Sequence, residues 1–115
     1  MNYLVSKRIP NAEAFLEHCE RITMKSKSVV FRQGELSQDF YLILEGSVSV
    51  IVDDVEDPEQ KMVVSYLNPG EFFGEMGLFG EETRAANLAT RTPCVFAKIS
   101  YDDFHAIRQR YPDVL

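Results

Sequence analysis

Cysteine and histidine are both scarce in this sequence, and each scarcity argues against a class of site. Cys19 and Cys94 are its two cysteines, and no paired C-x-x-C spacing is present. This pattern argues against a disulfide scaffold and a structural zinc site, and it favours a reducing cytoplasm. The two histidines, His18 and His105, fall in segments expected to be helical, so a metal-dependent jelly-roll enzyme with several histidines on strands is disfavoured.

The sequence also has few positively charged residues and no long apolar run. The chain has 12 Lys and Arg against 18 Asp and Glu, giving a net charge of −6. It therefore lacks the broad positive field that tight nucleic-acid binding needs, and any contact with DNA must come from another segment. No apolar stretch resembles a signal peptide or reaches membrane-spanning length, so we expect a soluble, cytoplasmic protein without a membrane partner.

What is present predicts a single, mainly β domain over residues 1–115. The apolar runs VVF, FYLIL, SVSVIV and KMVVSYL are short and rich in β-branched and aromatic residues, and turn-like segments separate them. We expect an antiparallel β-roll, similar to a jelly roll, over 22–99. Helical spacing predicts one short helix over 11–21, capped by Asn11, and a second over 100–111.

The segment P-G-E-F-F-G-E-M-G-L-F-G-E-E-T-R-A-A, residues 69–86, holds four of the six glycines. Glycines gather where backbone must approach another group closely or adopt positive φ, although a series of turns in a β-roll gives the same count. Arg84 is the one cation between Met62 and Thr90. It fits either an ion-paired surface residue or a phosphate-binding residue.

The second interpretation predicts a specific ligand chemistry. Arg84 would offer a planar, permanently charged fork to a phosphate, together with backbone N–H groups around Ala85. Glu75 is a pure acceptor, suited to a ribose hydroxyl but repelled by an adjacent phosphate. The pair predicts a ligand that carries both a hydroxyl and a phosphate. As an exposed pocket residue, Arg84 is expected to contribute little to the stability of the ligand-free fold.

The sequence around these residues resembles that of a known protein family. F-G-E-M-G-L-F followed by T-R-A-A is similar to the phosphate-binding cassette of the catabolite-activator and protein-kinase regulatory-subunit families. F-R-Q-G-E, Y-L-I-L-E-G-S-V-S-V, S-Y-L-N-P-G-E-F and A-K-I-S-Y-D-D-F extend the likeness over roughly Phe31 to Leu115. The chain resembles the cyclic-nucleotide-binding domain of the bacterial catabolite-activator family of transcription regulators.

The resemblance implies a non-enzymatic sensor for a cyclic mononucleotide, with cyclic AMP as the expected ligand, cyclic GMP as the alternative, and no cofactor or metal. It places the ribose 2′-hydroxyl at Gly74 and Glu75, and the cyclic phosphate at Arg84 and the backbone N–H of Ala85. The other ligand-binding residues that it implies are Met76, Val50, Val64, Ser65 and Phe73. Many bacterial relatives carry serine after the arginine. Ala85 lacks the serine hydroxyl, so we expect this difference to affect the affinity for the nucleotide.

The resemblance also implies parts that we expect to be absent from this chain. Family members continue into a long dimerisation helix and, in the bacterial regulators, a helix-turn-helix DNA-binding domain. We therefore expect the intact protein to be a homodimer that contacts DNA through that absent domain. This chain is expected to be monomeric or weakly associated.

Other interpretations stay open beside this one. A β-roll of this kind also suits a sensor of haem, an iron–sulfur cluster or another metabolite, or a degenerate module that keeps the fold for protein contacts without binding nucleotide. Two enzyme-like pairs are weaker: Cys94 with His105, because Cys94 lies in an apolar run, and Glu81 with Glu82, because adjacent turn residues do not face each other.

Overall fold

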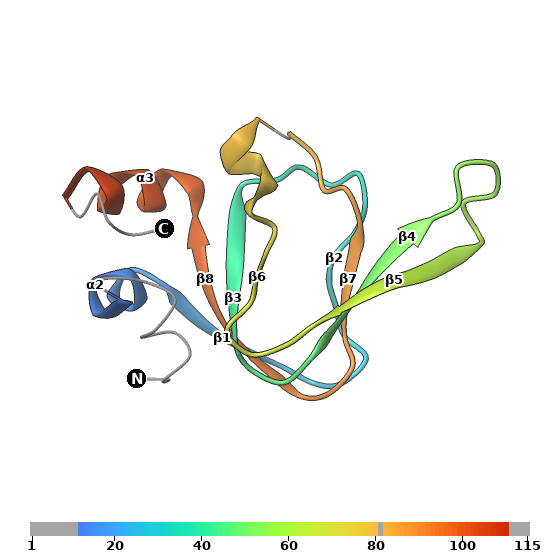
Figure 1. Ribbon diagram of the computed structural model, residues 1–115, viewed down its shortest axis with the longest axis horizontal. Coiled ribbons are helices and arrows are strands. Elements are labelled where there is room, and N and C mark those ends of the chain that lie inside the picture. Colours follow the sequence, from blue (N-terminus) through green and yellow to red (C-terminus); the bar gives the residue numbers. More distant parts are fainter. Residues whose placement is uncertain (1–11, 81, 111–115) are drawn as a thin grey trace.

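The computed structural model describes residues 12–80 and 82–110, and in this part of the chain two four-stranded antiparallel sheets form the body of the molecule (Figure 1). In chain order the elements are α2 (Ala12–Glu17), β1 (Glu20–Met24), β2 (Val29–Phe31), β3 (Asp39–Glu45), β4 (Val48–Asp53), β5 (Lys61–Leu67), β6 (Phe72–Phe73), the 3-10 helix η1 (Glu75–Phe79), β7 (Asn87–Thr90), β8 (Cys94–Ser100) and α3 (Tyr101–Arg110). The expected fold class, a mainly β antiparallel roll with short flanking helices, is confirmed.

The chain passes back and forth between the two sheets. One sheet has the strand order β1-β8-β3-β6 and the other the order β2-β7-β4-β5. Figure 1 shows α2 and α3 together on one side of the roll, with the β4–β5 hairpin extending away on the opposite side. At the top of this view, η1 and the segment that follows it connect the β3–β6 side to the β2–β7 side.

Strands β3 and β8 are buried on both faces, which explains their nearly continuous apolar sequence. Because successive strand residues point to opposite faces, alternate residues enter two different cores. The core under the helices contains Phe40, Leu42, Ala97 and Ile99 with Phe15, Phe104 and Ile107. The core between the sheets contains Tyr41, Ile43, Cys94 and Phe96 with Phe31, Val48, Phe73 and Leu88. Burying each large apolar side chain stabilises the fold by about 1.5–3 kcal/mol.

The first helix is shorter than its spacing predicts. It ends at Glu17, because the backbone N–H groups of His18 and Cys19 close a tighter turn onto carbonyls three residues earlier. Arg21 was expected in this helix, but it lies in β1 and pairs with Ala97 of β8. Strand pairing with β8 thus overrides the helical spacing. The predicted cap Asn11 lies outside the described residues.

The second helix begins close to its expected position. Ser100 precedes α3, and its hydroxyl oxygen accepts the backbone N–H of Asp103 at 3.1 Å, as an N-cap does. The expected end at residue 111 lies outside the described residues. Within the described part of the chain, no helix has the length and apolar character needed to cross a membrane.

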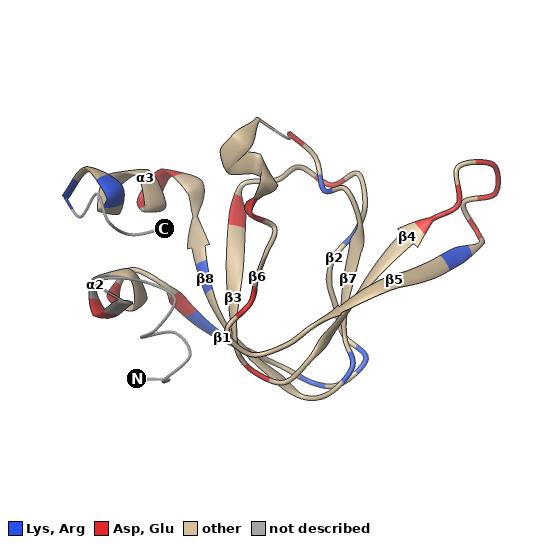
Figure 2. Cartoon of the chain, in the orientation of Figure 1, with Lys and Arg blue, Asp and Glu red and all other residues tan. Residues whose placement is uncertain are grey.

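The acidic loop between β4 and β5 forms the tip of the extended hairpin, where Figure 2 shows a run of Asp and Glu. Asp54 accepts backbone N–H groups from two loop residues that follow it. Where the loop joins the two strands, hydrogen bonds from Lys61 and Asn87 hold the pKa of Asp53 below its usual range. The loop is therefore held at its base and exposed at its tip.

Candidate functional site

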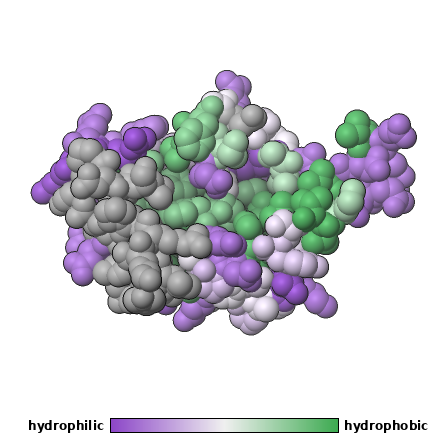
Figure 3. Space-filling view, in the orientation of Figure 1, coloured by the Kyte–Doolittle hydropathy of each residue, from purple (hydrophilic) through white to green (hydrophobic). Residues whose placement is uncertain are grey.

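A cavity of about 260 Å³ opens between the two sheets, beneath η1 and the segment that leads into β7. This volume lies just below the range of about 300–1,000 Å³ that is typical of small-molecule sites. Figure 3 shows apolar surface from η1 across the middle of the molecule to the β4–β5 hairpin. The lining residues are Phe31, Ser37, Val50, Leu67, Phe72, Phe73, Gly74, Glu75, Met76, Gly77, Thr83, Arg84, Ala85, Ala86 and Leu88.

Glycines at both ends of η1 let the backbone turn sharply into and out of the cavity wall. Gly74 has φ 81° and Gly80 has φ 105°, values in the left-handed region that side chains disfavour. Gly74 is also required for space, because a Cβ there would lie 2.7 Å from Nη1 of Arg84. This close approach brings Glu75, the first residue of η1, and Arg84 to the same cavity.

Arg84 is buried rather than exposed, which corrects the expectation from the sequence. It is 7% exposed, and its guanidinium stacks on Phe31 with Cζ 4.1 Å from the ring centroid. Nη1 donates to Ser37 Oγ at 2.9 Å, to the Asp39 carbonyl at 2.7 Å and to the Gly74 carbonyl at 3.1 Å. Protein acceptors thus already occupy part of the fork that was expected to bind phosphate.

A carboxylate on β3 completes this arrangement. Asp39 Oδ1 accepts from Arg84 Nη2 at 2.6 Å, and Lys98 Nζ lies 3.4 Å from Asp39 Oδ2. One carboxylate therefore lies between two cations. The neighbouring Tyr41 is affected as well: burial raises its pKa to about 12, the Asp39 carboxylate adds to the rise, and Arg84 opposes it. Tyr41 therefore stays neutral to a higher pH than an exposed tyrosine does.

Two polar atoms at the cavity are left without partners. Among the described residues, the buried side-chain atoms that make no hydrogen bond are Glu75 Oε2 and Arg84 Nε. An unpaired buried polar group costs about 1–3 kcal/mol, and a charged group costs more. Both residues line the same cavity, so an unpaired acceptor and an unpaired donor of opposite charge belong to one site. This arrangement suits a ligand with a hydroxyl for the carboxylate and an anion for the guanidinium.

The structure brings most of the predicted site residues to this cavity, but not all of them. Gly74, Glu75, Met76, Arg84, Ala85, Val50 and Phe73 line it. Val64 and Ser65 do not line it; they lie on β5, the edge strand of its sheet, where Val64 is 53% exposed. The ligand-binding role of these two residues stays a prediction.

Several residues that shape the site could not be identified from the sequence. Asp39 and Ser37 are far from residues 69–86 in the chain, and only the tertiary fold brings them to Arg84. Lys98 in turn contacts Asp39 from β8. Phe31 lies under the guanidinium for the same reason. Their side chains are common in β-rolls, so no local pattern distinguishes them. In the described part of the chain, no group of three or more His, Cys, Asp or Glu residues could hold a metal ion.

Comparison with known families identifies the family of this chain. The model of the family "Cyclic nucleotide-binding domain" matches residues 21–111. The chain belongs to this cyclic nucleotide-binding domain family. The domain is 44% identical over 107 residues to the cAMP-activated global transcriptional regulator CRP of Salmonella typhimurium, an alignment that covers 92% of this chain and 50% of CRP. The chain thus spans about half the length of the CRP relatives that it matches.

Solved structures show the same fold. The cyclic nucleotide-binding domain superposes on the Thermus thermophilus catabolite activator protein with a TM-score of 0.81 and 26% identity, over 95% of this chain and 51% of that one. It also matches CLP of Xanthomonas campestris, described as a c-di-GMP responsive global regulator, with a TM-score of 0.78 and 40% identity, over 84% of this chain and 46% of CLP. Both proteins therefore share the fold of this chain.

Proposed function

We propose that this domain is a non-enzymatic sensor of a cyclic mononucleotide, with cyclic AMP as its ligand and cyclic GMP as the alternative. The observation that carries the proposal is the pair of unpartnered atoms, Glu75 Oε2 and Arg84 Nε, on residues that line one cavity. A cyclic mononucleotide carries the ribose hydroxyl and the single negative charge that would satisfy both atoms at once.

The proposed binding mode follows from these two atoms. The ribose 2′-hydroxyl donates to Glu75 Oε2 beside the left-handed backbone of Gly74. The cyclic phosphate accepts from Arg84 Nε and from the backbone N–H of Ala85, while Arg84 Nη2 remains paired with Asp39. This mode keeps the phosphate away from the Glu75 carboxylate, which would repel it. The apolar lining residues Val50 and Phe73 would contact the sugar and the base.

The relatives support a role in transcription regulation. CRP of Salmonella typhimurium, 44% identical over the shared region, is a cAMP-activated transcriptional regulator. Because this chain spans about half the length of CRP, we propose that it is the sensing part of a comparable regulator. DNA binding through a separate domain and homodimerisation of the intact protein belong to the same proposal. So does the monomeric or weakly associated state of this chain.

A cyclic dinucleotide is the second candidate ligand, because CLP, at 40% identity, is described as c-di-GMP responsive. The charges at the cavity favour the mononucleotide. Arg84 is the one Lys or Arg among the described lining residues, so it offers one cation where a cyclic dinucleotide has two phosphates. The cavity of about 260 Å³ also favours the smaller ligand.

We expect cyclic AMP and cyclic GMP to bind this chain with affinities that differ by less than about a hundredfold, or about 2.7 kcal/mol. In the proposed mode, Glu75 and Arg84 bind the ribose and the phosphate, which the two ligands share. Linear AMP should bind more weakly, because one cation faces its additional negative charge. Calorimetric titrations with these three nucleotides and cyclic di-GMP test the proposal. Binding of neither cyclic mononucleotide, or tighter binding of cyclic di-GMP, would contradict it.

A further inference from the structure

The side chain of Tyr101, the first residue of α3, is hydrogen-bonded into the wall of the cavity. Its hydroxyl donates to the carbonyl oxygen of Gly74 at 2.5 Å and shares a short hydrogen bond with the hydroxyl of Ser37. Arg84 Nη1 donates to both of these groups, at 2.9 Å to Ser37 Oγ and at 3.1 Å to the Gly74 carbonyl. These four residues form a closed ring of hydrogen bonds, which we call the Tyr101 ring.

The direction of each bond in the Tyr101 ring follows from the protons available. The Gly74 carbonyl can only accept, so the single proton of the Tyr101 hydroxyl is directed to it. The Ser37 hydroxyl must then donate to the Tyr101 oxygen, and Ser37 in turn accepts from Arg84. Every donor therefore points the same way along the path from Arg84 to Gly74. Hydrogen bonds in such a chain polarise and strengthen one another.

Packing holds the tyrosine in this position. Gly77 of η1 lies so close to the Tyr101 side chain that a Cβ on Gly77 would be 2.3 Å from the nearest aromatic carbon of Tyr101. The aromatic side chain of Tyr101 stacks on that of Phe40, with ring centroids 6.2 Å apart and planes inclined by 20°. Its backbone N–H donates to the Gln38 carbonyl at 3.0 Å, just before β3. The start of α3 is thereby joined both to η1 and to the segment that carries Ser37.

We propose that the Tyr101 hydroxyl is a positioning residue for the nucleotide site and couples its occupancy to α3. The ring supplies two of the three acceptors of Arg84 Nη1 and so fixes the orientation of the guanidinium, whose Nε has no partner. It also fixes the carbonyl of Gly74, the residue directly before Glu75. A ligand that binds Arg84 and Glu75 contacts one member of the ring and the residue next to another member, Gly74. It therefore restrains the ring, and the hydrogen bonds of Tyr101 extend this restraint to the first turn of α3. This inference rests on the proposed function.

The test replaces Tyr101 with phenylalanine, which keeps the packed aromatic ring and removes only the hydroxyl. We expect the Kd for cyclic AMP to rise about fivefold to tenfold, the equivalent of roughly 1–1.4 kcal/mol. Tyr66→Phe is the matched control: Tyr66 lies on β5, is about half exposed, and stacks with Arg91, away from the Tyr101 ring. Its Kd should equal that of the wild type.

Two further measurements separate a positioning role from simple packing. In the ring, the effects of Tyr101→Phe and Ser37→Ala on Kd should be non-additive, because either change breaks the same chain of bonds. Cyclic AMP should slow amide hydrogen exchange in the first turn of α3 in the wild type and slow it less in Tyr101→Phe. Additive effects on Kd together with unchanged exchange would overturn the inference and assign the residue to packing.

The outcomes also distinguish this inference from the proposed function. A wild-type chain that binds cyclic AMP, beside a Tyr101→Phe variant with the same Kd, overturns the role of Tyr101 and leaves the proposed function standing. A wild-type chain that binds neither cyclic AMP nor cyclic GMP overturns the proposed function and this inference with it. Unfolding of the ligand-free variants is followed in parallel, so that affinity is compared between folded proteins.

Discussion

Replacing Arg84 with alanine is expected to weaken the binding of cyclic AMP by more than tenfold, a loss of roughly 2 to 5 kcal/mol. Arg84 is the one Lys or Arg among the described residues that line the cavity, and its Nε has no partner in the ligand-free protein. Without this side chain, a phosphate in the cavity would be desolvated with no charged donor. Isothermal calorimetry of the variant and the wild type measures the difference.

The same substitution should also lower the stability of the ligand-free protein, contrary to the expectation from the sequence. Arg84 is 7% exposed, and its two Nη atoms make four hydrogen bonds with Ser37, Asp39 and Gly74. Their loss should cost about 1–3 kcal/mol. The effect stays below that of a fully buried ion pair, because the Asp39 side chain is 22% exposed and keeps Lys98 at 3.4 Å.

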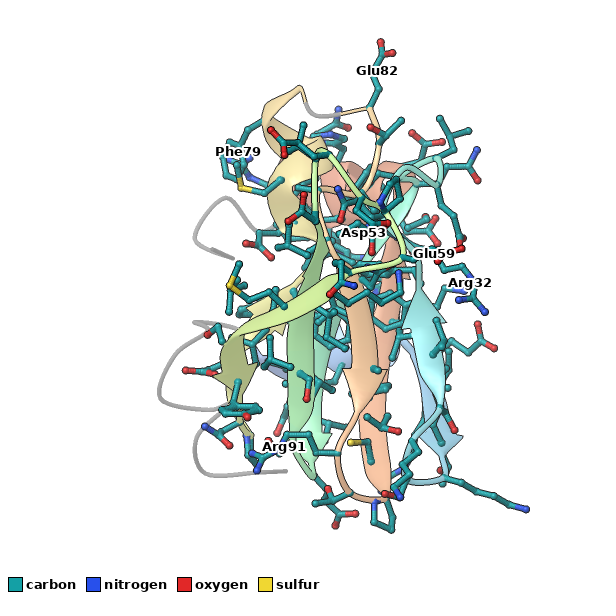
Figure 4. All side chains as sticks on the ribbon, turned by 90° about the vertical axis from the view of Figure 1, so that its right-hand side faces the viewer. Arg32, Asp53, Glu59, Phe79, Glu82 and Arg91 are labelled. Atoms are coloured by element: carbon teal, nitrogen blue, oxygen red, sulfur yellow. The ribbon has the colours of Figure 1, made fainter. Side chains whose placement is uncertain are left out.

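Two more variants make this result interpretable. Arg84→Lys keeps the charge but not the planar geometry, so it should recover part of the affinity and tests the assignment if Arg84→Ala does not fold. Arg91→Ala is the control for removing an arginine: Arg91 is exposed, and Figure 4 shows it at the opposite end of the roll from Phe79 of η1. Wild-type affinity in a folded Arg84→Ala protein would reject the phosphate assignment.

The strands of the fold could be predicted from the sequence because their signal is local. Residues 39–45 and 94–100 combine apolar and β-branched side chains in short runs, and both form strands. The division of their side chains between two cores could not be predicted, since it depends on which sheet each strand joins. The end of the first helix was missed for a similar reason. Arg21 continues a helical spacing, and its pairing with β8 is a long-range contact.

The site, like the fold, could be predicted where its signal is local and could not be predicted where it depends on tertiary contacts. Gly74, Glu75 and Arg84 are marked by glycine spacing, isolated charge and the family motif, and the structure places them around one cavity. The exposure of Arg84 was predicted wrongly, because its partner Asp39 lies 45 residues earlier and no pattern in the sequence links the two. A motif thus identified the charged groups, while the fold determined which of their atoms have no hydrogen-bond partner.

The last prediction concerns Glu75, where ligand affinity and stability should respond differently. Glu75→Gln should weaken cyclic AMP binding by about tenfold, because a hydrogen bond to a charged group contributes about 1.5–3 kcal/mol and one to a neutral group about 0.5–1.5 kcal/mol. The ligand-free protein should be as stable as the wild type or more stable by up to about 1 kcal/mol. The physical reason is that Glu75 Oε2 is buried without a partner, and a neutral amide is less costly to bury than a carboxylate. Calorimetric titration and denaturant unfolding of the same preparations measure both quantities.

A ligand that lacks the 2′-hydroxyl makes this prediction specific to the ribose. In the wild type, 2′-deoxy cyclic AMP should bind at least as weakly as cyclic AMP binds to Glu75→Gln, because the deoxy ligand has no hydroxyl to donate, whereas glutamine keeps a neutral carbonyl oxygen that can accept one. Glu75→Gln itself should discriminate less between the two ligands than the wild type does, because its hydrogen bond to the hydroxyl is no longer assisted by charge. The matched control is Glu82→Gln, which removes an exposed carboxylate just beyond η1 and should bind cyclic AMP like the wild type (Figure 4). If Glu75→Gln still prefers the 2′-hydroxyl as strongly as the wild type does, the hydroxyl is bound elsewhere and Glu75 has no part in recognising the ribose.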